Sequence, residues 1–187
     1  MILVADSGST KTQWVLIEQE TVSEPSQTEG LNPLTSSEGA FLKASSEVMH
    51  HFNITKSCEK IFFYGAGCGT PAMQEYVSSS LSYCFPNTYI SVSGDLLGAC
   101  RACCEASHGI VGILGTGSNA CFYDGHNIAH QLPSLGYLLG DEGSGNQIGR
   151  LLLKSYLSQQ MPEALRTDFH NNYPYSYHQF IARIYQE

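Results

Sequence analysis

The sequence predicts an α/β protein with two lobes, each built on a sheet flanked by helices, and three observations support this. Strand and helix patterns alternate along the first half of the chain, which is typical of a partly parallel sheet covered by helices. At Gly109 a new series of strand patterns begins. Two short hairpins of small residues, around Gly8 and Gly117, stand 109 positions apart and indicate a duplicated lobe. We therefore expect a first lobe over residues 1–108 and the start of a second over 109–187.

The elements of the first lobe follow from apolar runs that are separated by turn and cap residues. Apolar runs bounded by glycine or hydroxyl residues predict strands. Ser36 or Ser37 can cap a helix, Pro71 suits a first helical position, and Asp95 follows a strand where a helical pattern begins. The expected strands are 2–5, 13–17, 21–27, 60–64 and 89–92, and the expected helices are 36–52, 71–84 and 95–106.

The second lobe begins like the first but lacks its later strand–helix pairs. Strands are expected over 110–114, 120–123 and 127–131, with a hairpin turn at Asp124-Gly125. Helical patterns follow, over 142–158, 162–170 and 175–186. The second lobe therefore looks unfinished, and we expect either that another chain supplies the remainder or that the protein is longer.

The composition excludes several classes of protein. The chain of 187 residues carries 9 Lys+Arg against 17 Asp+Glu, which gives a formal net charge of −8. This balance argues against nucleic acid or an anionic membrane as the main partner, because both attract basic surfaces. An apolar share of 42% excludes a disordered chain, and no apolar run reaches the roughly 20 residues of a membrane span. Since the N-terminus does not resemble a signal peptide, we expect a cytoplasmic location.

The seven cysteines are expected to be reduced thiols, because an odd number in a chain without an export signal does not fit a disulfide framework. Cys100, Cys103 and Cys104 lack a second pair of ligands at the spacing of a zinc site. We interpret these three as small buried residues of a helix.

A polar segment, Asp6-Ser7-Gly8-Ser9-Thr10-Lys11-Thr12, joins the first two predicted strands. A glycine turn lets backbone N–H groups approach phosphate oxygens, and the hydroxyls of Ser9, Thr10 or Thr12 can add hydrogen bonds. Asp6 can hold hydrated Mg²⁺, which favours carboxylate, water and phosphate ligands. The alternative interpretation is a simple polar hairpin turn.

A second segment of the same kind is Leu114-Gly115-Thr116-Gly117-Ser118-Asn119. It is neither a Walker A loop nor a Rossmann fingerprint, because the glycine spacing differs and a strand rather than a helix follows. Two such turns, each between paired strands and in opposite halves of the chain, predict a nucleotide held between the lobes.

Further acidic residues stand near the starts of predicted helices. Asp95 follows a strand, and an aspartate aimed at a substrate hydroxyl is the type of base that phosphoryl transfer uses. Asp95 can equally be an ordinary N-cap. Asp141 and Glu142, among the glycines of 140–145, can accept hydrogen bonds from sugar hydroxyls or form an acidic helix cap.

Together, Asp6-x-Gly8-x-Thr10-Lys11-Thr12, Gly115-Thr116-Gly117-Ser118-Asn119 and Gly140-Asp141-Glu142-Gly143-Ser144 resemble the N-acetylglucosamine kinase family. This family belongs to the BadF-type ATPases, within the superfamily of sugar kinases, Hsp70 and actin. The resemblance covers the chain to about residue 155, and the last two motifs are specific to the family. It implies two ribonuclease-H-like lobes, with Mg-ATP in the cleft between them and the sugar beside it.

The resemblance also implies roles for individual residues. Asp95 matches the catalytic aspartate that takes the proton of the sugar C6 hydroxyl, and Asp6 stands where Mg²⁺ is held through water. The phosphate-binding residues would be Gly8, Ser9, Thr10, Lys11, Thr12, Gly115, Thr116, Gly117 and Ser118, and the sugar contacts would be Asn32, Thr116, Gly117 and Asp141.

The expected partners are therefore ATP and a small amino sugar, with a homodimer as a compatible assembly. The glycine-rich segment that holds adenosine in this family has no counterpart in the 187 residues. We therefore expect weak or absent kinase activity for this chain alone.

Two other functions are compatible with the sequence. One is an activator ATPase of the BadF type, which couples ATP hydrolysis to a redox partner. Such relatives hold an iron–sulfur cluster through a cysteine in the stretch that corresponds to 140–145, where this chain has none. The other is a non-catalytic sensor of a sugar or a nucleotide.

Overall fold

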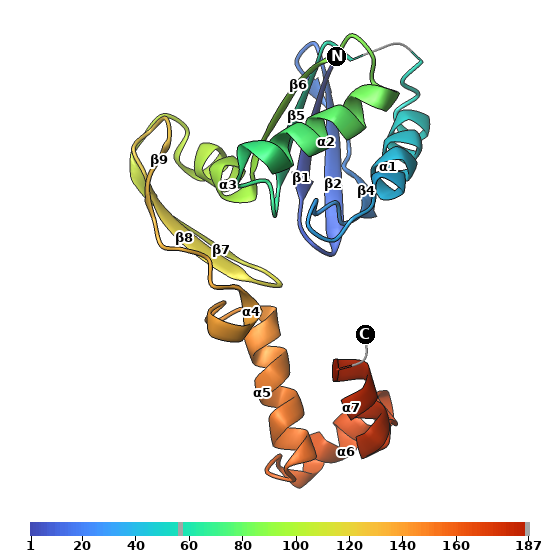
Figure 1. Ribbon diagram of the computed structural model, residues 1–187, viewed down its shortest axis with the longest axis vertical. Helices are drawn as coiled ribbons and strands as arrows, with labels where there is room; N and C mark the ends of the chain where they lie inside the picture. The colour runs from blue at the N-terminus through green and yellow to red at the C-terminus, as the bar shows by residue number, and fades with distance from the viewer. Residues whose placement is uncertain (56–57, 186–187) are drawn as a thin grey trace.

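The computed structural model describes residues 1–55 and 58–185, which form a lobe around one mixed sheet, a second sheet and a series of helices (Figure 1). The strands of the first sheet are β1 (Ile2–Ser7), β2 (Lys11–Glu18), β3 (Thr21–Val22), β4 (Ser26–Glu29), β5 (Lys60–Gly65) and β6 (Tyr89–Gly94). Their order is β3-β2-β1-β5-β6, with β4 also paired to β2. β1 to β3 form an antiparallel meander, whereas β5 and β6 follow parallel to β1. The predicted α/β class is confirmed.

Helices cover both faces of this sheet. α1 (Glu38–His51) and α2 (Pro71–Cys84) pack on one face. α3 (Asp95–Cys104) lies on the other face, where a Cβ on Gly98 would come within 2.8 Å of the Tyr64 ring. The main core consists of Leu3, Ala5, Trp14, Ile61 and Phe63 from the strands and Phe41, Ala44, Val48, Val77 and Leu81 from the helices.

The helices of the first lobe begin where the sequence predicts. Ser37 caps α1, and its Oγ accepts a hydrogen bond from a backbone N–H of the first turn (3.4 Å). Pro71 is the first residue of α2, directly after its N-cap Thr70. Asp95 is the first residue of α3 and Gly94 is the N-cap, so Asp95 is not an ordinary N-cap residue. The carboxylate of Asp95 is therefore carried on the rigid first turn of a helix.

The second sheet is a three-stranded antiparallel meander in the order β7-β8-β9, which repeats the order of the β1–β3 meander. Its strands are β7 (Gly109–Leu114), β8 (Ser118–Tyr123) and β9 (Ile128–Gln131). α3 also packs against this sheet, in a second core formed by Leu96, Cys100, Val111, Cys121 and Tyr123. α3 therefore contacts both sheets. A lobe boundary between residues 108 and 109 stays a prediction.

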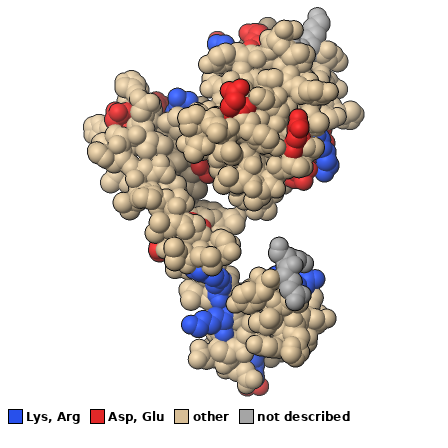
Figure 2. Space-filling view, in the orientation of Figure 1, with Lys and Arg blue, Asp and Glu red and all other residues tan. Residues whose placement is uncertain are grey.

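Beyond the second sheet the chain continues as α4 (Gly136–Leu139), α5 (Gly145–Leu157), α6 (Glu163–Asn172) and α7 (Tyr177–Tyr185). α5 extends away from the sheets (Figure 1), and its Ile148, Leu151 and Leu152 are exposed. Most of the surface seen in Figure 2 carries neither acidic nor basic side chains. None of the helices within 1–55 and 58–185 is long and apolar enough to cross a membrane.

The structure differs from the sequence predictions at a few places. The strand expected over 21–27 is divided into β3 and β4, and Pro25, which has no N–H for a sheet ladder, lies between them. The helix expected from residue 142 begins at Gly145, and α4, a single turn, was not predicted. Cys103 is exposed and Cys104 is half-buried, so the interpretation of the α3 cysteines as buried is confirmed for Cys100 alone.

Candidate functional site

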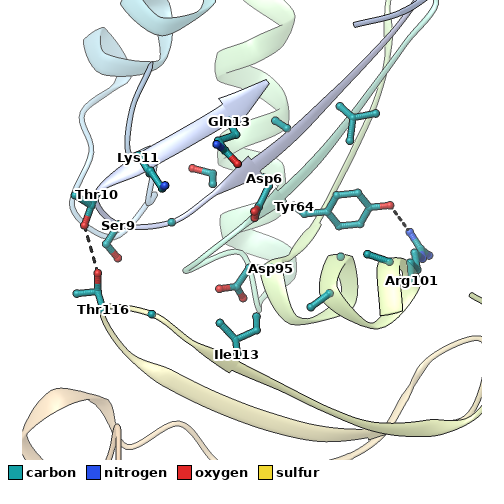
Figure 3. Close-up of a pocket in the computed structure, with 18 residues that line it drawn as sticks. Asp6, Ser9, Thr10, Lys11, Gln13, Tyr64, Asp95, Arg101, Ile113 and Thr116 are labelled. Atoms are coloured by element: carbon teal, nitrogen blue, oxygen red, sulfur yellow. Dashed lines mark hydrogen bonds between the residues drawn. The ribbon is translucent and has the colours of Figure 1, made fainter. Parts of the chain in front are cut away.

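A cavity of about 700 Å³ lies between the two sheets (Figure 3). Three segments that are far apart in the sequence line it: the β1–β2 turn, α3 and the β7–β8 turn. We call residues 8–10 the first turn and residues 115–117 the second turn. The lining residues that were predicted from the sequence are Asp6, Gly8, Ser9, Thr10, Lys11, Asp95, Gly115 and Thr116.

The first turn is held in place by the loop that follows β4. Within the turn, the Gly8 N–H donates to the Lys11 carbonyl oxygen (2.9 Å). Gly30 packs directly against the turn, since a Cβ there would lie 2.7 Å from the Gly8 carbonyl oxygen. Asn32 of the same loop donates from Nδ2 to Ser9 Oγ (3.3 Å). The loop therefore fixes the first turn and places Asn32 beside it.

The two turns face each other across the mouth of the cavity. Thr10 Oγ1 and Thr116 Oγ1 lie 3.3 Å apart although the residues are 106 positions apart in the chain (Figure 3). A ligand with several phosphate oxygens could accept hydrogen bonds from both turns at once. The facing arrangement that the sequence predicts for the two turns is therefore present.

The register of the sheet explains which side chains form the floor of the cavity. Asp6 of β1 stands opposite Gln13 of β2 and Tyr64 of β5, so the three side chains share one face of the sheet. Arg101 of α3 donates from Nη1 to Tyr64 Oη (2.9 Å), at the end of the cavity away from the turns (Figure 3). Sequence reasoning missed Gln13, Tyr64 and Arg101, although strand alternation across the hairpin from Asp6 could have found Gln13.

Asp95 and Asp6 both point into the cavity from opposite sides (Figure 3). Asp95 Oδ1 accepts a hydrogen bond from the Leu96 N–H (2.8 Å). Burial raises the pKa of the Asp95 carboxyl above its ordinary value, and the negative charge of Asp6 raises it further, against the opposing effect of the Leu96 hydrogen bond. A raised pKa makes the carboxylate of Asp95 a stronger proton acceptor than an ordinary aspartate.

The second turn is held from outside the cavity by the segment that leads into α5. The first two backbone N–H groups of α5 donate to the carbonyl oxygens of Gly115 and Thr116 (2.9 and 3.1 Å). Asp141 Oδ1 accepts a hydrogen bond from the Ser118 N–H (3.0 Å). The segment around Asp141 therefore contacts the back of the second turn.

Some of the predicted site residues do not line the cavity. Thr12 is fully buried; its hydroxyl donates to the Glu29 carbonyl oxygen (3.0 Å) and is 2.7 Å from Ser7 Oγ. The phosphate-binding role predicted for Thr12 does not agree with this geometry, because the hydroxyl faces the core. The other predicted residues outside the lining are Gly117, which is the last residue of the second turn, and Asn32, Ser118 and Asp141, which stand beside the turns.

The donor set of the cavity fits phosphate groups that carry a magnesium ion. The hydroxyls of both turns and the ammonium group of Lys11 suit phosphate oxygens. The carboxylate of Asp6 is a hard oxygen ligand of the type that Mg²⁺ takes together with water and phosphate. Within the described residues, no group of three or more His, Cys, Asp or Glu gathers into a metal site. A metal ion here would therefore depend on phosphate and water for most of its ligands.

Solved structures resemble this chain over almost its full length. A protein from Porphyromonas gingivalis, named "putative N-acetylglucosamine kinase", is 42% identical over 99% of this chain and 66% of its own, with a TM-score of 0.90. A protein of the same name from Chromobacterium violaceum is 18% identical over 91% of this chain and 62% of its own, with a TM-score of 0.68. A glucokinase from Balamuthia mandrillaris is 15% identical over 86% of this chain and 55% of its own, with a TM-score of 0.51. No protein-family model and no curated protein matches the chain.

The chain thus spans 66% and 62% of the lengths of the first two relatives. The likeness to the C. violaceum and B. mandrillaris proteins shows a common fold, that of sugar kinases and actin-like ATPases. The likeness to the P. gingivalis protein goes further, because 42% of the residues are identical along 99% of the chain. The chain belongs to the N-acetylglucosamine kinase family.

Proposed function

We propose that the protein is an ATP-dependent sugar kinase that transfers the γ-phosphoryl group to the C6 hydroxyl of N-acetylglucosamine or a related amino sugar. The observation that carries this proposal is the short distance between the hydroxyl oxygens of Thr10 and Thr116 (3.3 Å), one from each turn. The cavity that these turns border is also lined by Asp6 and Asp95. The names of the two relatives from P. gingivalis and C. violaceum support an amino sugar as the acceptor.

In the proposed reaction Asp95 is the catalytic base. Its carboxylate is fixed by α3 and by the Leu96 N–H (2.8 Å), and its raised pKa favours acceptance of a proton. Asp95 takes the proton of the attacking sugar hydroxyl while the new oxygen–phosphorus bond forms and the bond to the leaving ADP oxygen breaks. In phosphoryl transfer, the position of this base contributes more than its basicity.

The two turns are proposed to hold the phosphates. Backbone N–H groups and hydroxyls of the first and second turns donate to phosphate oxygens, and Lys11 offsets their negative charge. Asp6 is the residue that would hold Mg²⁺, through water. When bound, Mg²⁺ would neutralise charge on the phosphate oxygens.

The proposed sugar contacts are Asn32, Thr116, Gly117 and Asp141. Asn32 is fixed before any ligand binds, because its Oδ1 accepts the Leu34 N–H (3.0 Å) and its Nδ2 donates to Ser9. Gly67 packs against the Asn32 side chain at a φ of +81°, where only glycine is unstrained. Such a fixed amide suits recognition of a sugar hydroxyl.

We further propose that the 187 residues alone have weak kinase activity or none. In the part of the chain that the structure describes, the cavity lining at the two turns consists of hydroxyls, glycines and Lys11, together with the apolar Ile113. The aromatic ring that lines the cavity, Tyr64, is held by Arg101 at the opposite end. The phosphates therefore have partners in this chain, whereas the glycine-rich segment that holds adenosine in this family has no counterpart in the 187 residues.

The proposal is tested by comparing the wild type with Asp95→Asn in the full encoded protein. We expect sugar-dependent ADP release to fall about 10²–10⁴-fold, because the general base is lost. ATP binding, measured by calorimetry, should stay close to that of the wild type, because Asn preserves the shape of the side chain. Phosphorylation by Asp95→Asn at the wild-type rate would remove Asp95 from its role. ATP hydrolysis by the wild type that no amino sugar stimulates would reject the kinase.

A further inference from the structure

The carboxylate of Asp141 is packed against the back of the second turn. Its Oδ1 accepts the Ser118 N–H (3.0 Å). A Cβ placed on Gly117 would lie 3.0 Å from each of the two carboxylate oxygens. The carboxylate thus occupies the space that a side chain at position 117 would need. Glycine at 117 is therefore explained by the close approach of Asp141.

The backbone around Asp141 is shaped to make this contact. Asp141 has a φ of +61°, in the left-handed region that costs free energy for a residue with a side chain. Its carbonyl oxygen accepts the N–H of Ser144, which is the N-cap of α5. The first N–H groups of α5 in turn donate to Gly115 and Thr116. Asp141, the start of α5 and the second turn therefore form one hydrogen-bonded unit.

This unit decides where the Thr116 hydroxyl lies. The second turn contains two glycines, which give the backbone many accessible conformations. A single hydrogen bond closes the turn internally, from the Gly115 N–H to the Gly117 carbonyl oxygen (2.9 Å). The contacts from Asp141 and from the start of α5 restrain the turn further. In this arrangement Thr116 Oγ1 lies 3.3 Å from Thr10 Oγ1. A phosphate site works best when its donors are oriented before the ligand arrives.

We propose that Asp141 is a positioning residue for the second turn, acting through the Ser118 N–H and the space beside Gly117. This role goes beyond the sugar contact that the family resemblance implies for Asp141. Only the expected effect of Asp141 on turnover rests on the proposed kinase function. The effect on the turn itself is a property of the free protein.

The experiment measures amide hydrogen exchange of residues 112–121 in the protein without nucleotide or sugar. Four variants are compared with the wild type: Asp141→Ala, Asp141→Gly, Asp141→Asn and Asp124→Ala. Asp141→Ala and Asp141→Gly both remove the acceptor, and the glycine variant also removes the strain of the positive φ. Asp141→Asn retains an oxygen that can accept the Ser118 N–H and tolerates the left-handed backbone. Asp124→Ala is the matched control, because Asp124 accepts two backbone N–H groups in the β8–β9 turn (2.8 and 2.7 Å).

We expect the Ser118 amide to exchange about tenfold faster or more in Asp141→Ala and Asp141→Gly, because a hydrogen bond to a charged acceptor is lost. Asp141→Asn should restore most of the protection, and Asp124→Ala should leave this segment unchanged. In the full encoded protein, the alanine variant should raise the KM for ATP and the asparagine variant should bring it back toward the wild-type value.

Two results would overturn the proposal: wild-type exchange of Ser118 in both Asp141→Ala and Asp141→Gly, or exchange in Asp141→Asn as fast as in those variants. Failure of the kinase proposal would be seen separately, as absence of sugar-dependent turnover by the wild type. In that case the exchange data would still decide whether Asp141 positions the turn.

Discussion

The hydroxyls of Ser7 and Thr12 lie 2.7 Å apart, both fully buried, directly below the first turn. The two residues are register partners at the end of the β1–β2 hairpin. Ser7 Oγ also accepts the Leu31 N–H (3.1 Å), and Thr12 donates to the Glu29 carbonyl oxygen (3.0 Å). The pair therefore joins the hairpin to the loop that carries Asn32, and it supports both the first turn and the proposed sugar contact.

Thr12→Val should destabilise the protein without removing a ligand contact. The substitution keeps the shape of the side chain but removes the hydroxyl that bonds the buried Ser7 Oγ and donates to the Glu29 carbonyl oxygen, which costs about 1–3 kcal/mol. Urea denaturation would measure the loss. Thr10→Val is the matched control: its hydroxyl is exposed at the cavity, so we expect a stability change within about 0.5 kcal/mol and weaker ATP binding. The reverse pattern would place Thr12, rather than Thr10, at the phosphates.

Asp95→Asn should stabilise the folded protein at neutral pH. Because the pKa of Asp95 is raised in the folded state by burial and by Asp6, ionisation of this carboxyl favours the unfolded chain. The loss of folding stability begins as the pH rises above the pKa of about 3.9 that an aspartate has in the unfolded chain. It is complete once the pH exceeds the raised pKa of Asp95 in the folded protein. Thermal unfolding of both proteins should therefore show a higher Tm for Asp95→Asn at pH 7 and similar values near pH 3. A lower Tm at pH 7 would contradict the direction of the shift.

The same raised pKa should appear in the pH profile of turnover. Protonated Asp95 cannot accept the proton of the sugar hydroxyl, so the acid limb should lie above the ordinary range of an aspartate. The profile of kcat/KM in the full encoded protein measures this limb. Lys11→Met is a useful comparison, because it weakens phosphate binding and should leave the position of the acid limb unchanged. An acid limb at or below the ordinary aspartate value would contradict the assignment.

The thiols should react with iodoacetamide in an order set by burial. Burial raises the pKa of Cys68 and of Cys100 to about 12, so almost no thiolate forms at these positions at pH 8. Cys103 is exposed on the surface of α3 and should be alkylated first. Mass spectrometry of peptides before and after urea would show the order. Alkylation of Cys68 in the folded protein at the rate of Cys103 would indicate that the core under Asp95 opens.

The sequence predicts most of the first lobe and the two facing turns because their signals are local. Gly8 and Gly117 each stand between two apolar runs, and Asp95 stands at a junction of strand and helix. Thr12 was misplaced for a related reason. The strand was expected from residue 13, whereas β2 begins at Lys11, so alternation turns Thr12 toward the core while Lys11 and Gln13 face the cavity. When the first residues of a strand are polar, the sequence does not show at which residue the alternation between buried and exposed side chains begins.

The contacts that could not be predicted are those between segments that are distant in the chain. The pairing of Tyr64 with Arg101 requires the register of β5 against β1 and the position of α3 above it. The contact of Asp141 with Ser118 requires the approach of α5 to the second turn. No local pattern of apolar or turn residues encodes these distances. They follow only from the packing of whole elements.

Gly98→Ala should destabilise the protein although it improves the helix propensity of α3. Alanine is favoured over glycine in a helix by about 1 kcal/mol. However, a Cβ on Gly98 would lie 2.8–3.0 Å from the Cβ, Cγ and Cδ1 atoms of Tyr64, which are close to the backbone of β5 and cannot swing away. Overpacking of this kind costs about 1–3 kcal/mol, so α3 must shift away from the sheet and carry Asp95 with it.

Gly149→Ala in α5 is the matched control, because a Cβ there meets nothing within 4 Å and the substitution should be neutral or stabilising. Urea denaturation of both variants, with turnover of the full encoded protein, measures the difference. A Gly98→Ala protein as stable and as active as Gly149→Ala would show that Asp95 does not depend on the close contact of α3 with β5.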